Sequence, residues 1–372
     1  MASSQAPILF SANSSWNLLN FRAPIIRALM DRKLRVAAAV PRDSGAASLG
    51  ELGVELHYIP IDVHGLSPVR DIRLLTSYFN LMRRVRPSAF LGFTAKPNIY
   101  GSVAAARLGI PVLNTVSGLG TAFLSGRALQ FLVSNIYQYA LRRSERVFFH
   151  NADDRNLFLS RKLVRASQTR VVAGSGVDVD RFSPPADPTL HEPPTFLFIG
   201  RLLRDKGAKE FAEAASLVLK TKSARFQMLG SADEHPKAVT EEELQPFISA
   251  GAIELLGQSD DVRPFIELAD CVVLPSYREG LPRVLLEASA MATPVIATDV
   301  PGCRHAVEHG RTGLLCSPKS SESLAATMID FLDMSPPERR MMGHSGREKA
   351  VLEFSDEEVV AAYLEALREV GI

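Results

Sequence analysis

Cysteine is scarce in this sequence, and long apolar runs are missing from it. The three cysteines, Cys271, Cys303 and Cys316, are odd in number and lack metal-ligand spacing, which argues against a disulfide scaffold and against a zinc site. No run approaches the roughly 20 apolar residues that a membrane span needs. The first residues lack the basic stretch and apolar core of a signal peptide. We therefore expect a globular, cytoplasmic protein that is not threaded through a bilayer.

Signatures of several protein classes are also missing. No Gly-x-Gly-x-x-Gly follows the first predicted strand of either half of the chain, which argues against a dehydrogenase. A sugar-nucleotide epimerase would need acid/base carboxylates or histidines in its cleft, and none can be assigned from the sequence. No zinc finger, RNP-type aromatic motif or lysine-rich tail is present, so we expect no nucleic-acid partner.

Charge is distributed unevenly along the chain. Of the 372 residues, 46% are hydrophobic and 22% are charged, which fits a globular chain of about two domains. The net charge is only +1, yet residues 1–175 carry 22 Lys/Arg against 9 Asp/Glu. Such a basic half suits nucleic acid, anionic lipid or a phosphorylated substrate. Because nucleic acid is disfavoured, an anionic membrane surface or a phosphorylated substrate is the better interpretation.

Short apolar runs alternate with helical patterns in both halves, which is typical of parallel α/β layers. The strands predicted for the first half are residues 7–10, 36–40, 55–59, 89–93, 112–115 and 146–149. Those predicted for the second half are residues 195–200, 225–229, 253–256, 271–274 and 295–297. Helices are predicted at residues 22–32, 281–292 and 356–370.

Five prolines between Ser183 and Pro194 predict a linker between two domains. We expect an N-terminal domain at 1–182, the linker at 183–194, a C-terminal domain at 195–355 and a last helical segment at 356–372. Periodicity alone does not decide whether that segment packs back on the first domain. Two open α/β domains form a cleft between the carboxyl ends of their sheets, and ligands bind there by default.

The segment from Tyr277 to Glu287 places two carboxylates eight positions apart around a predicted helix start. Backbone N–H groups from Gly280 to Arg283 would face the carboxyl edge of the sheet, where phosphates bind. Glu279 and Glu287 would then flank the phosphates of a sugar nucleotide. A helix cap at Glu279 and a solvated Glu287 explain the pattern about as well. However, Glu287 lies in an apolar stretch where an unpaired charge is costly, so it needs a partner.

Three other predicted strand ends of the second half carry polar residues or glycine. Arg201 and Lys206 follow the first strand, and two cations there fit a diphosphate. Gly230 and Ser231 follow the second, where glycine lets the backbone approach a ligand closely. Gln258 follows the third. Taken alone, the two cations are better explained as surface residues and each glycine turn is weak evidence, but together these loops favour one binding site.

These motifs make the half from Thr195 onward similar to a family 4 retaining glycosyltransferase of the GT-B fold. The motifs are the segment from Gly200 to Gly207 and the E-x7-E pattern from Glu279 to Glu287, with residues 312–315 beyond. The resemblance implies an α/β architecture, in which two Rossmann-like parallel-sheet domains face each other across a cleft.

Motifs of the first half narrow the resemblance. Residues 93–102 and 118–123 resemble bacterial enzymes that extend polyprenyl-diphosphate-linked sugars, such as undecaprenyl-diphosphate-linked ones. The similarity extends along nearly the whole chain. One departure is the loop from Thr115 to Gly120, which lacks the His that many members carry near the donor sugar. No general base is therefore assigned.

The resemblance implies roles for the donor-site residues. Arg201 and Lys206 would hold the donor diphosphate, and with Glu279 at the donor sugar they would form the catalytic group. Glu287 would bind the ribose. Further donor contacts are expected from Gly230, Ser231, Gln258, Gly280, Leu281 and Pro282. The resemblance also implies retaining transfer, with a UDP-sugar as donor substrate. Because cations and the helix start would stabilise the leaving diphosphate, we expect no requirement for a metal or a cofactor.

The acceptor is expected in the basic first domain. The expected acceptor contacts are Arg22, Lys96, Asn98, Gly118 and Gly120. An apolar, aromatic segment at 128–141 has Arg127 before it and arginines after it. It is either an interfacial helix or a buried core helix, and its exposure separates the two. We expect a peripheral enzyme on the inner face of the cytoplasmic membrane.

Two other functions would share this donor site. One is a soluble family 4 glycosyltransferase acting on a small metabolite or a glucan, and the other is a regulator that binds nucleotide sugars without catalysis. An N-acetylhexosamine is the expected sugar. The choice among N-acetylgalactosamine, N-acetylglucosamine and a neutral hexose depends on one or two contacts, which the sequence does not reveal.

Overall fold

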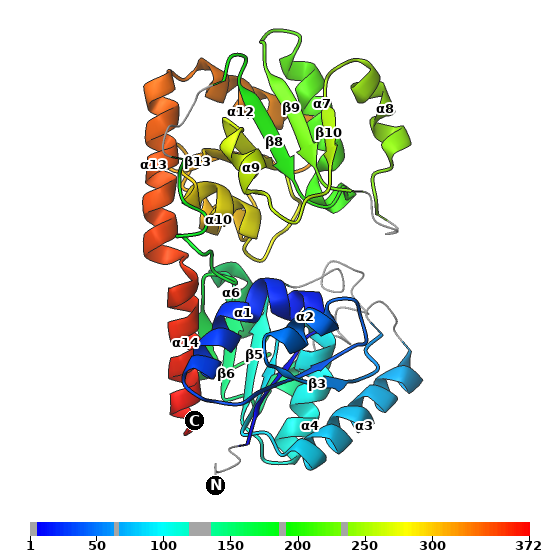
Figure 1. Cartoon of the computed structure of the whole chain (residues 1–372). Helices are drawn as coiled ribbons and strands as arrows, with labels where there is room; N and C mark the ends of the chain where they lie inside the picture. Colours follow the sequence, from blue (N-terminus) through cyan, green and yellow to red (C-terminus); the bar gives the residue numbers. More distant parts are fainter. Residues whose placement is uncertain (1–5, 63–66, 119–134, 186–190, 232–236) are drawn as a thin grey trace. The chain divides into compact units, whose positions relative to one another are not determined.

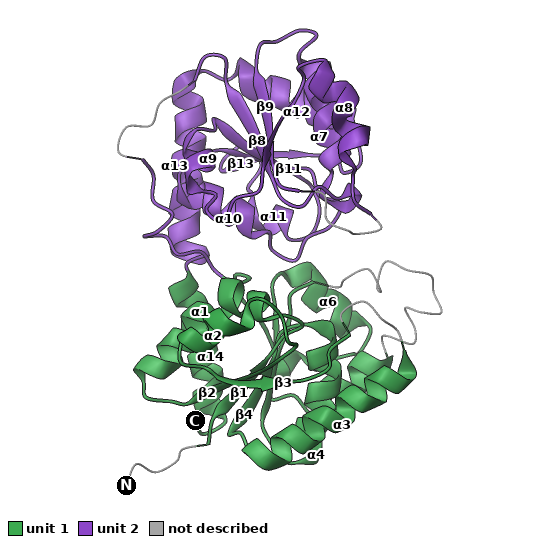
Figure 2. Ribbon diagram, turned by 45° about the vertical axis from the view of Figure 1, so that its right-hand side comes forward, with its two compact units in different colours: residues 1–175, 356–372 green, residues 176–355 purple. Residues whose placement is uncertain are grey.

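The computed structural model describes the whole chain except residues 1–5, 63–66, 119–134, 186–190 and 232–236. By its internal contacts the chain divides into two compact units (Figures 1 and 2). Unit 1 comprises residues 1–175 and 356–372, and unit 2 comprises residues 176–355. Each unit holds one parallel sheet, which confirms the expected α/β class with two Rossmann-like domains. The linker expected at 183–194 lies partly outside the described residues.

The sheet of unit 1 has seven strands in the order β3-β2-β1-β4-β5-β6-β7, all parallel. The strands are β1 (Ile8–Ser11), β2 (Val36–Val40), β3 (Glu55–Tyr58), β4 (Ala89–Gly92), β5 (Val112–Val116), β6 (Arg146–Phe149) and β7 (Thr169–Val171). The helices include α1 (Ser15–Asp31), α2 (Ala46–Glu51), α3 (Pro68–Val85), α4 (Ser102–Arg107), α6 (Ala152–Ser160) and α14 (Asp356–Glu369).

Helices cover both faces of the unit 1 sheet. Because the side chains of a strand alternate between its two faces, each strand contributes to a core on either side. On β1, Ile8 and Phe10 enter a core with residues of α1 and α14, including Tyr363. Leu9 enters the opposite core with residues of α3 and α4, including Tyr78. Helices α1 and α14 therefore cover one face, and α3 and α4 cover the other.

The sheet of unit 2 has six parallel strands in the order β10-β9-β8-β11-β12-β13. The strands are β8 (Thr195–Ile199), β9 (Arg225–Leu229), β10 (Glu254–Gly257), β11 (Cys271–Leu274), β12 (Val295–Thr298) and β13 (Gly313–Cys316). The helices are α7 (Ala208–Val218), α8 (Glu241–Ser249), α9 (Arg263–Glu267), α10 (Arg283–Ala290), α11 (Cys303–Ala306), α12 (Ser321–Asp333) and α13 (Pro336–Glu353).

Among the differences from the sequence prediction, three have local reasons. Helix α1 begins at Ser15 rather than at residue 22, because the Ser14 side chain caps it by accepting from the Asn17 N–H. Strand β7 escaped prediction because it has three residues, one of them the exposed Arg170. Strand β13 escaped it because it opens on glycine, which is depleted in strands.

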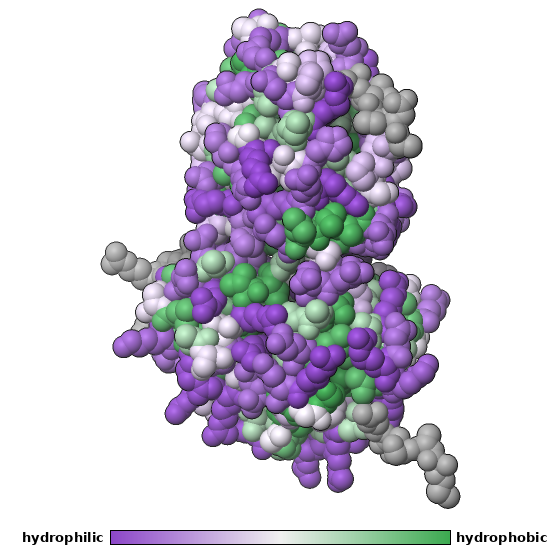
Figure 3. Space-filling view, turned by 90° about the vertical axis from the view of Figure 1, so that its left-hand side faces the viewer, coloured by the Kyte–Doolittle hydropathy of each residue, from purple (hydrophilic) through white to green (hydrophobic). Residues whose placement is uncertain are grey.

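The described helices give no sign of a membrane span. None of them is both long enough and apolar enough to cross a bilayer. The face of the molecule in Figure 3 is largely hydrophilic, and its apolar side chains form small separate patches.

Candidate functional site

Except for Glu287, the expected donor residues lie in loops at the carboxyl ends of β8, β9, β10 and β11. Parallel strands bring these ends to one edge of the sheet. The Gly200 N–H donates to the Leu229 carbonyl at 3.0 Å, and the Gly230 N–H donates to the Gly257 carbonyl at 2.7 Å. A Cβ added to Gly230 would lie 1.9 Å from the Gly200 oxygen. The first two loops therefore pack backbone against backbone, which only glycine allows at position 230.

The loop after β8 carries Lys206 to the loop after β11. Gly207 has φ +73°, and a Cβ there would lie 2.2 Å from the Pro275 oxygen, so glycine permits this close approach. Lys206 Nζ lies 2.5 Å from Glu279 Oε1. The Glu279 side chain is only 11% exposed. The structure thus brings together two of the three expected catalytic residues, while Arg201 is exposed at the end of β8.

Gly302 is a member of this site that the sequence prediction missed. It follows β12, has φ +84°, and a Cβ there would lie 2.5 Å from the Gly280 oxygen and 2.7 Å from the Glu279 oxygen. Gly302 therefore supports the backbone that carries Glu279. A glycine shortly after a predicted strand was the available signal, because the same pattern had singled out Gly230.

Two further donor residues contact each other. The Gln258 side-chain amide donates to the Ser231 hydroxyl, which joins the loops after β9 and β10. Gln258 is exposed, and Ser231 is partly exposed. Both side chains are therefore polar groups at the same edge as the Lys206–Glu279 pair.

Helix α10 holds Glu287 two turns beyond Glu279. The helix begins at Arg283, after an N-cap at Pro282, and is shorter than the predicted helix at residues 281–292. Leu281, which precedes the N-cap, is buried. Arg283 Nε lies 2.8 Å from Glu287 Oε1. Burial raises the pKa of Glu287, and the charge of Arg283 opposes that rise. Arg283 therefore supplies the partner that a carboxylate in this apolar stretch needs.

In unit 1, the two expected acceptor cations are both engaged within the fold. Arg22 is only 2% exposed, and its guanidinium carbon lies 4.7 Å from the centroid of the Phe93 ring. Lys96 Nζ lies 2.7 Å from Asp71 Oδ1, and their side chains are 15% and 17% exposed. Of the two cations, Lys96 is therefore the more accessible.

Asn98 has a buried place inside unit 1. Its amide donates to the Thr115 carbonyl at 2.7 Å and accepts from the Asn114 amide at 2.9 Å. These bonds tie the segment after β4 to β5. Gly118 is partly exposed just after β5, and Gly120 lies outside the described residues.

His150, which the sequence left without a role, follows β6 at the carboxyl edge of the unit 1 sheet. It is 6% exposed, and its Nε2 has no hydrogen-bond partner among the described residues. Burial first, and then the charge of Arg22, hold the pKa of His150 well below its usual value. Both the burial and the neighbouring charge therefore disfavour the protonated imidazolium.

The apolar segment at 128–141 is described only from residue 135, and Arg127 lies outside the described residues. In the described part, Tyr137 and Leu141 are buried in a core with Phe149 and Phe158. Tyr139 is 60% exposed on the other side. This part is a helix with a core face, so it favours the core alternative over the interfacial one.

The described residues include no group of three or more His, Cys, Asp or Glu that could hold a metal ion. One Asp-x-Asp sequence occurs, at Asp178-Val179-Asp180. Asp178 Oδ1 accepts from the backbone N–H groups of Asp180 at 3.2 Å and Arg181 at 2.9 Å. That oxygen therefore stabilises a local turn.

Comparison with known families adds to this geometry. Residues 193–334 match the model of glycosyl transferases group 1, and residues 7–151 match a glycosyl transferase 4-like model. The chain is 26% identical to an N,N'-diacetylbacillosaminyl-diphospho-undecaprenol alpha-1,3-N-acetylgalactosaminyltransferase of Campylobacter jejuni, covering 87% of this chain and 89% of the relative. It is 22% identical to a UDP-Gal:alpha-D-GlcNAc-diphosphoundecaprenol alpha-1,3-galactosyltransferase of Escherichia coli, covering 75% of each chain.

Solved structures share the fold over the whole length. A glycosyltransferase from Rickettsia africae has a TM-score of 0.81 at 16% identity, covering 99% of both chains. HepE of Anabaena, solved with UDP-glucose, has a TM-score of 0.78 at 17% identity, covering 98% of this chain and 99% of that one. The first half of the chain matches the glycosyl transferase 4-like model, and the second half matches the model of glycosyl transferases group 1. Since the two-sheet fold is shared as well, the chain belongs to the GT-B glycosyltransferases.

Proposed function

We propose that this protein transfers a sugar from a UDP-sugar to a polyprenyl-diphosphate-linked saccharide. The Lys206–Glu279 pair carries the proposal. It places a cation, which can bind a diphosphate, beside a carboxylate, which can accept hydrogen bonds from sugar hydroxyls, at the carboxyl edge of the unit 2 sheet. Relatives named for undecaprenyl-diphosphate-linked sugars support the acceptor class. The proposed sugar is an N-acetylhexosamine, by similarity to the Campylobacter jejuni enzyme.

Binding of the donor would break the ion pair between Lys206 and Glu279, and both side chains would then contact the donor. When the nucleotide sugar binds, Lys206 turns to the diphosphate, and Glu279 accepts hydrogen bonds from the sugar hydroxyls. Arg201 and the backbone from Gly280 to Pro282 complete the diphosphate contacts. As the glycosidic bond breaks, negative charge grows on the leaving diphosphate, and these fixed donors stabilise it. A metal ion is not needed for that task.

The remaining donor contacts follow the same edge. Glu287, held by Arg283, accepts from the ribose hydroxyls, and Gly230, Ser231 and Gln258 line the nucleoside end. We propose retention of configuration, in which the acceptor hydroxyl approaches the sugar from the face that the nucleoside diphosphate leaves.

For the acceptor we propose that Lys96 and the loop at Gly118 and Gly120 meet its diphosphate. The buried Arg22 would supply a positive field from beneath, and Asn98 would position the loops through its two hydrogen bonds. A lipid-linked acceptor implies peripheral association with an anionic membrane surface.

The test is a screen of nucleotide sugars against a short-chain polyprenyl-diphosphate sugar, read by product mass and linkage. We expect a UDP-N-acetylhexosamine to be consumed, with the anomeric configuration retained and with no loss of rate in a metal chelator. Equal use of free sugars or glucans would favour the soluble transferase. UDP-sugar binding without turnover would favour the regulator.

Replacing Lys206 separates the proposed chemistry from general charge effects. Lys206→Ala should lower kcat/KM by about a hundredfold or more, because it removes a donor to the leaving group. The matched control is Lys237→Ala, whose Nζ lies 2.6 Å from Asp205 Oδ2 in the same unit with a half-exposed side chain. It should stay within about twofold of the wild type. A Lys206→Ala enzyme as fast as the control would contradict the proposal.

A further inference from the structure

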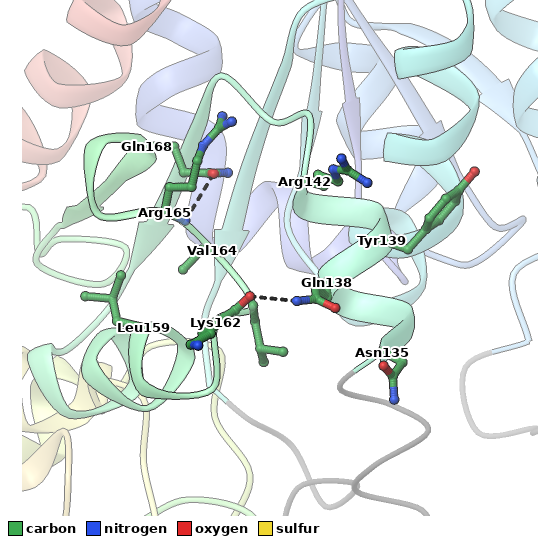
Figure 4. Close-up of a pocket in the computed structure, with 10 residues that line it drawn as sticks. Asn135, Gln138, Tyr139, Arg142, Leu159, Lys162, Val164, Arg165 and Gln168 are labelled. Atoms are coloured by element: carbon green, nitrogen blue, oxygen red, sulfur yellow. Dashed lines mark hydrogen bonds between the residues drawn. The ribbon is translucent and has the colours of Figure 1, made fainter.

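Unit 1 contains a pocket that none of the proposed donor or acceptor contacts uses. Its volume is about 580 Å³, within the range of small-molecule sites. One wall is the described helix around Gln138 and Arg142, and the other is the end of α6 with the segment up to β7 (Figure 4). Leu159, Leu163 and Val164 give it an apolar part.

All the charged side chains that line the described part of the pocket are positive. Arg142, Lys162 and Arg165 contribute to its wall, whereas no Asp or Glu among the described residues does. None of these three side chains pairs with a carboxylate in the described part of the chain, although nearby Arg146 pairs with Glu369. Three unpaired cations around one hollow repel one another, so an anion in the pocket would relieve that repulsion.

The walls of the pocket are held together by neutral hydrogen bonds. The Gln138 amide donates to the Lys162 carbonyl at 2.9 Å, across the pocket (Figure 4). The buried Gln168 amide donates to the Leu141 carbonyl at 2.9 Å and accepts from the Arg165 N–H at 3.2 Å. These bonds fix the backbone on both sides, and they leave the three cationic heads available.

The pocket lies at the opposite edge of the sheet from the proposed acceptor contacts. Arg142 comes shortly before β6, and Gln168 directly before β7, so both stand at the amino ends of strands. Gly118 and His150 stand at the carboxyl ends. Arg107 extends the basic character at the amino edge, since it donates to the exposed Tyr139 hydroxyl at 3.2 Å.

We propose that this pocket binds a phosphate group carrying a short apolar neighbour, as in a phospholipid head group or a small phosphate ester. Arg142 and Arg165 offer planar donors to phosphate oxygens, and Lys162 adds a compact charge. The apolar part accommodates the carbon chain next to the phosphate. The proposal stands independently of the transfer reaction.

Binding is measured without nucleotide sugar, so failure of the proposed transfer does not affect the outcome. One arm uses phosphatidylcholine vesicles with and without phosphatidylglycerol, read by co-sedimentation. The other uses glycerol 3-phosphate and inorganic phosphate, read by calorimetry. Binding to phosphatidylglycerol vesicles alone identifies a lipid head group, and binding of the soluble esters identifies a free phosphate ligand.

The variant Arg142→Gln/Lys162→Gln/Arg165→Gln should weaken binding by about tenfold or more, because three charge-assisted contacts are lost. The control Arg27→Gln/Lys33→Gln/Arg73→Gln removes the same charges from exposed positions of unit 1 outside the pocket. It should bind within about twofold of the wild type. Equal loss in both triple variants, or no binding of either probe to the wild type, overturns the proposal.

A second variant guards against misfolding. Lys162 has φ +55° and Lys33 has φ +63°, a region that glycine adopts without strain. Lys162→Gly should therefore fold at least as well as the wild type and still bind about threefold or more weakly. Lys33→Gly, with the same backbone change, should bind normally. Unchanged binding in Lys162→Gly overturns the role of this cation in the pocket.

Discussion

Glu287 lies where a carboxylate is costly. Its neighbours Leu286 and Ala288 are buried, and burial raises its pKa above the ordinary value. Arg283 Nε at 2.8 Å opposes that rise and keeps the ion pair within the helix. Arg283 thus offsets part of the effect of burial, which by itself favours the neutral form of Glu287.

A pH-dependent stability follows from this shift. The folded state holds the proton of Glu287 more tightly than the unfolded state, whose pKa is near 4.5. The resulting stabilisation is complete below that value and is lost as the pH rises through the folded pKa. Glu287→Gln mimics the protonated form, so it should gain stability relative to wild type from about pH 4 to about pH 7. Urea midpoints at the two values measure the gain.

Glu338→Gln is the control with the opposite sign. Hydrogen bonds from the Ser335 hydroxyl and N–H lower the pKa of Glu338. Its stabilising contribution is present above the ordinary pKa and is lost as the pH falls, so this variant should lose relative stability over the same rise. Parallel profiles for the two variants would show that Glu287 does not have the proposed environment.

At this scale, the sequence predicts which residues lie at the strand ends better than which of them pair. Glu279 and Lys206 were identified because each follows a predicted strand. Their contact joins residues 73 positions apart, which only the sheet order brings together. The partner of Glu287 was within reach of sequence reasoning, because Arg283 is four positions earlier on the same helix.

At the scale of elements, loops with glycine connect the strand ends. Gly302 lies against the backbone of Glu279 and Gly280, whereas Gly310 has a similar φ of +79° and no atom within 4 Å of an added Cβ. A side chain at position 310 would therefore cause backbone strain alone, whereas a side chain at position 302 would cause the same strain and a steric clash.

Gly310→Ala should lower the free energy of unfolding by about 1–2 kcal/mol, the cost of a left-handed conformation in a non-glycine residue. Gly302→Ala should lower the free energy of unfolding by about 1–3 kcal/mol more than Gly310→Ala does, because the added methyl group overpacks the site. It should also displace the loop that carries Glu279. Only Gly302→Ala should lower the rate of sugar transfer markedly. Denaturant unfolding and kcat/KM measure the two effects, and equal rates in both variants would exclude a supporting role for Gly302.

Most strands could be predicted because each is a short, buried apolar run between turns. Strand β6 and strand β9 have the predicted bounds, Arg146–Phe149 and Arg225–Leu229. Prediction failed where an edge strand relies on its neighbour. Strands β7 and β13 lie at sheet edges, and β7 has only three residues, so the pairing with β6 defines it more than its own composition.

At the scale of the whole molecule, the last helix completes the first unit. Tyr363 of α14 lies at 4.3 Å between ring centroids from Phe148, and its hydroxyl is 2.5 Å from Thr115 Oγ1. Two ion pairs join this helix to the sheet, Arg146 with Glu369 and Arg170 with Glu365. The acidic helix therefore offsets part of the positive charge of residues 1–175.

Tyr363→Phe should lower the stability of unit 1 by about 1–3 kcal/mol, because Thr115 loses a buried hydrogen-bond partner. Hydrogen exchange should speed up in β5 and β6 and stay unchanged in β8 and β9. Glu357→Ala, at an exposed position of the same helix, should change stability by no more than about 0.5 kcal/mol. Equal acceleration in β8 and β9 would contradict this assignment of α14.

The fold class was predictable because alternating strands and helices leave few arrangements. The place of α14 was not, since its hydrogen bond to Thr115 spans 248 positions of the chain. Amphipathic periodicity predicts a helix with one buried face, but it carries no information about which sheet buries it.

The return of α14 to unit 1 sets an order of events at the ribosome. Residues 176–355 emerge before residues 356–372, so unit 2 is complete while the core of unit 1 still lacks Tyr363 and its neighbours. Domains generally fold as units during synthesis, the earlier one first. Here the second unit can finish first, and the nascent first unit must keep its apolar sheet face from aggregating until residues 356–372 have emerged.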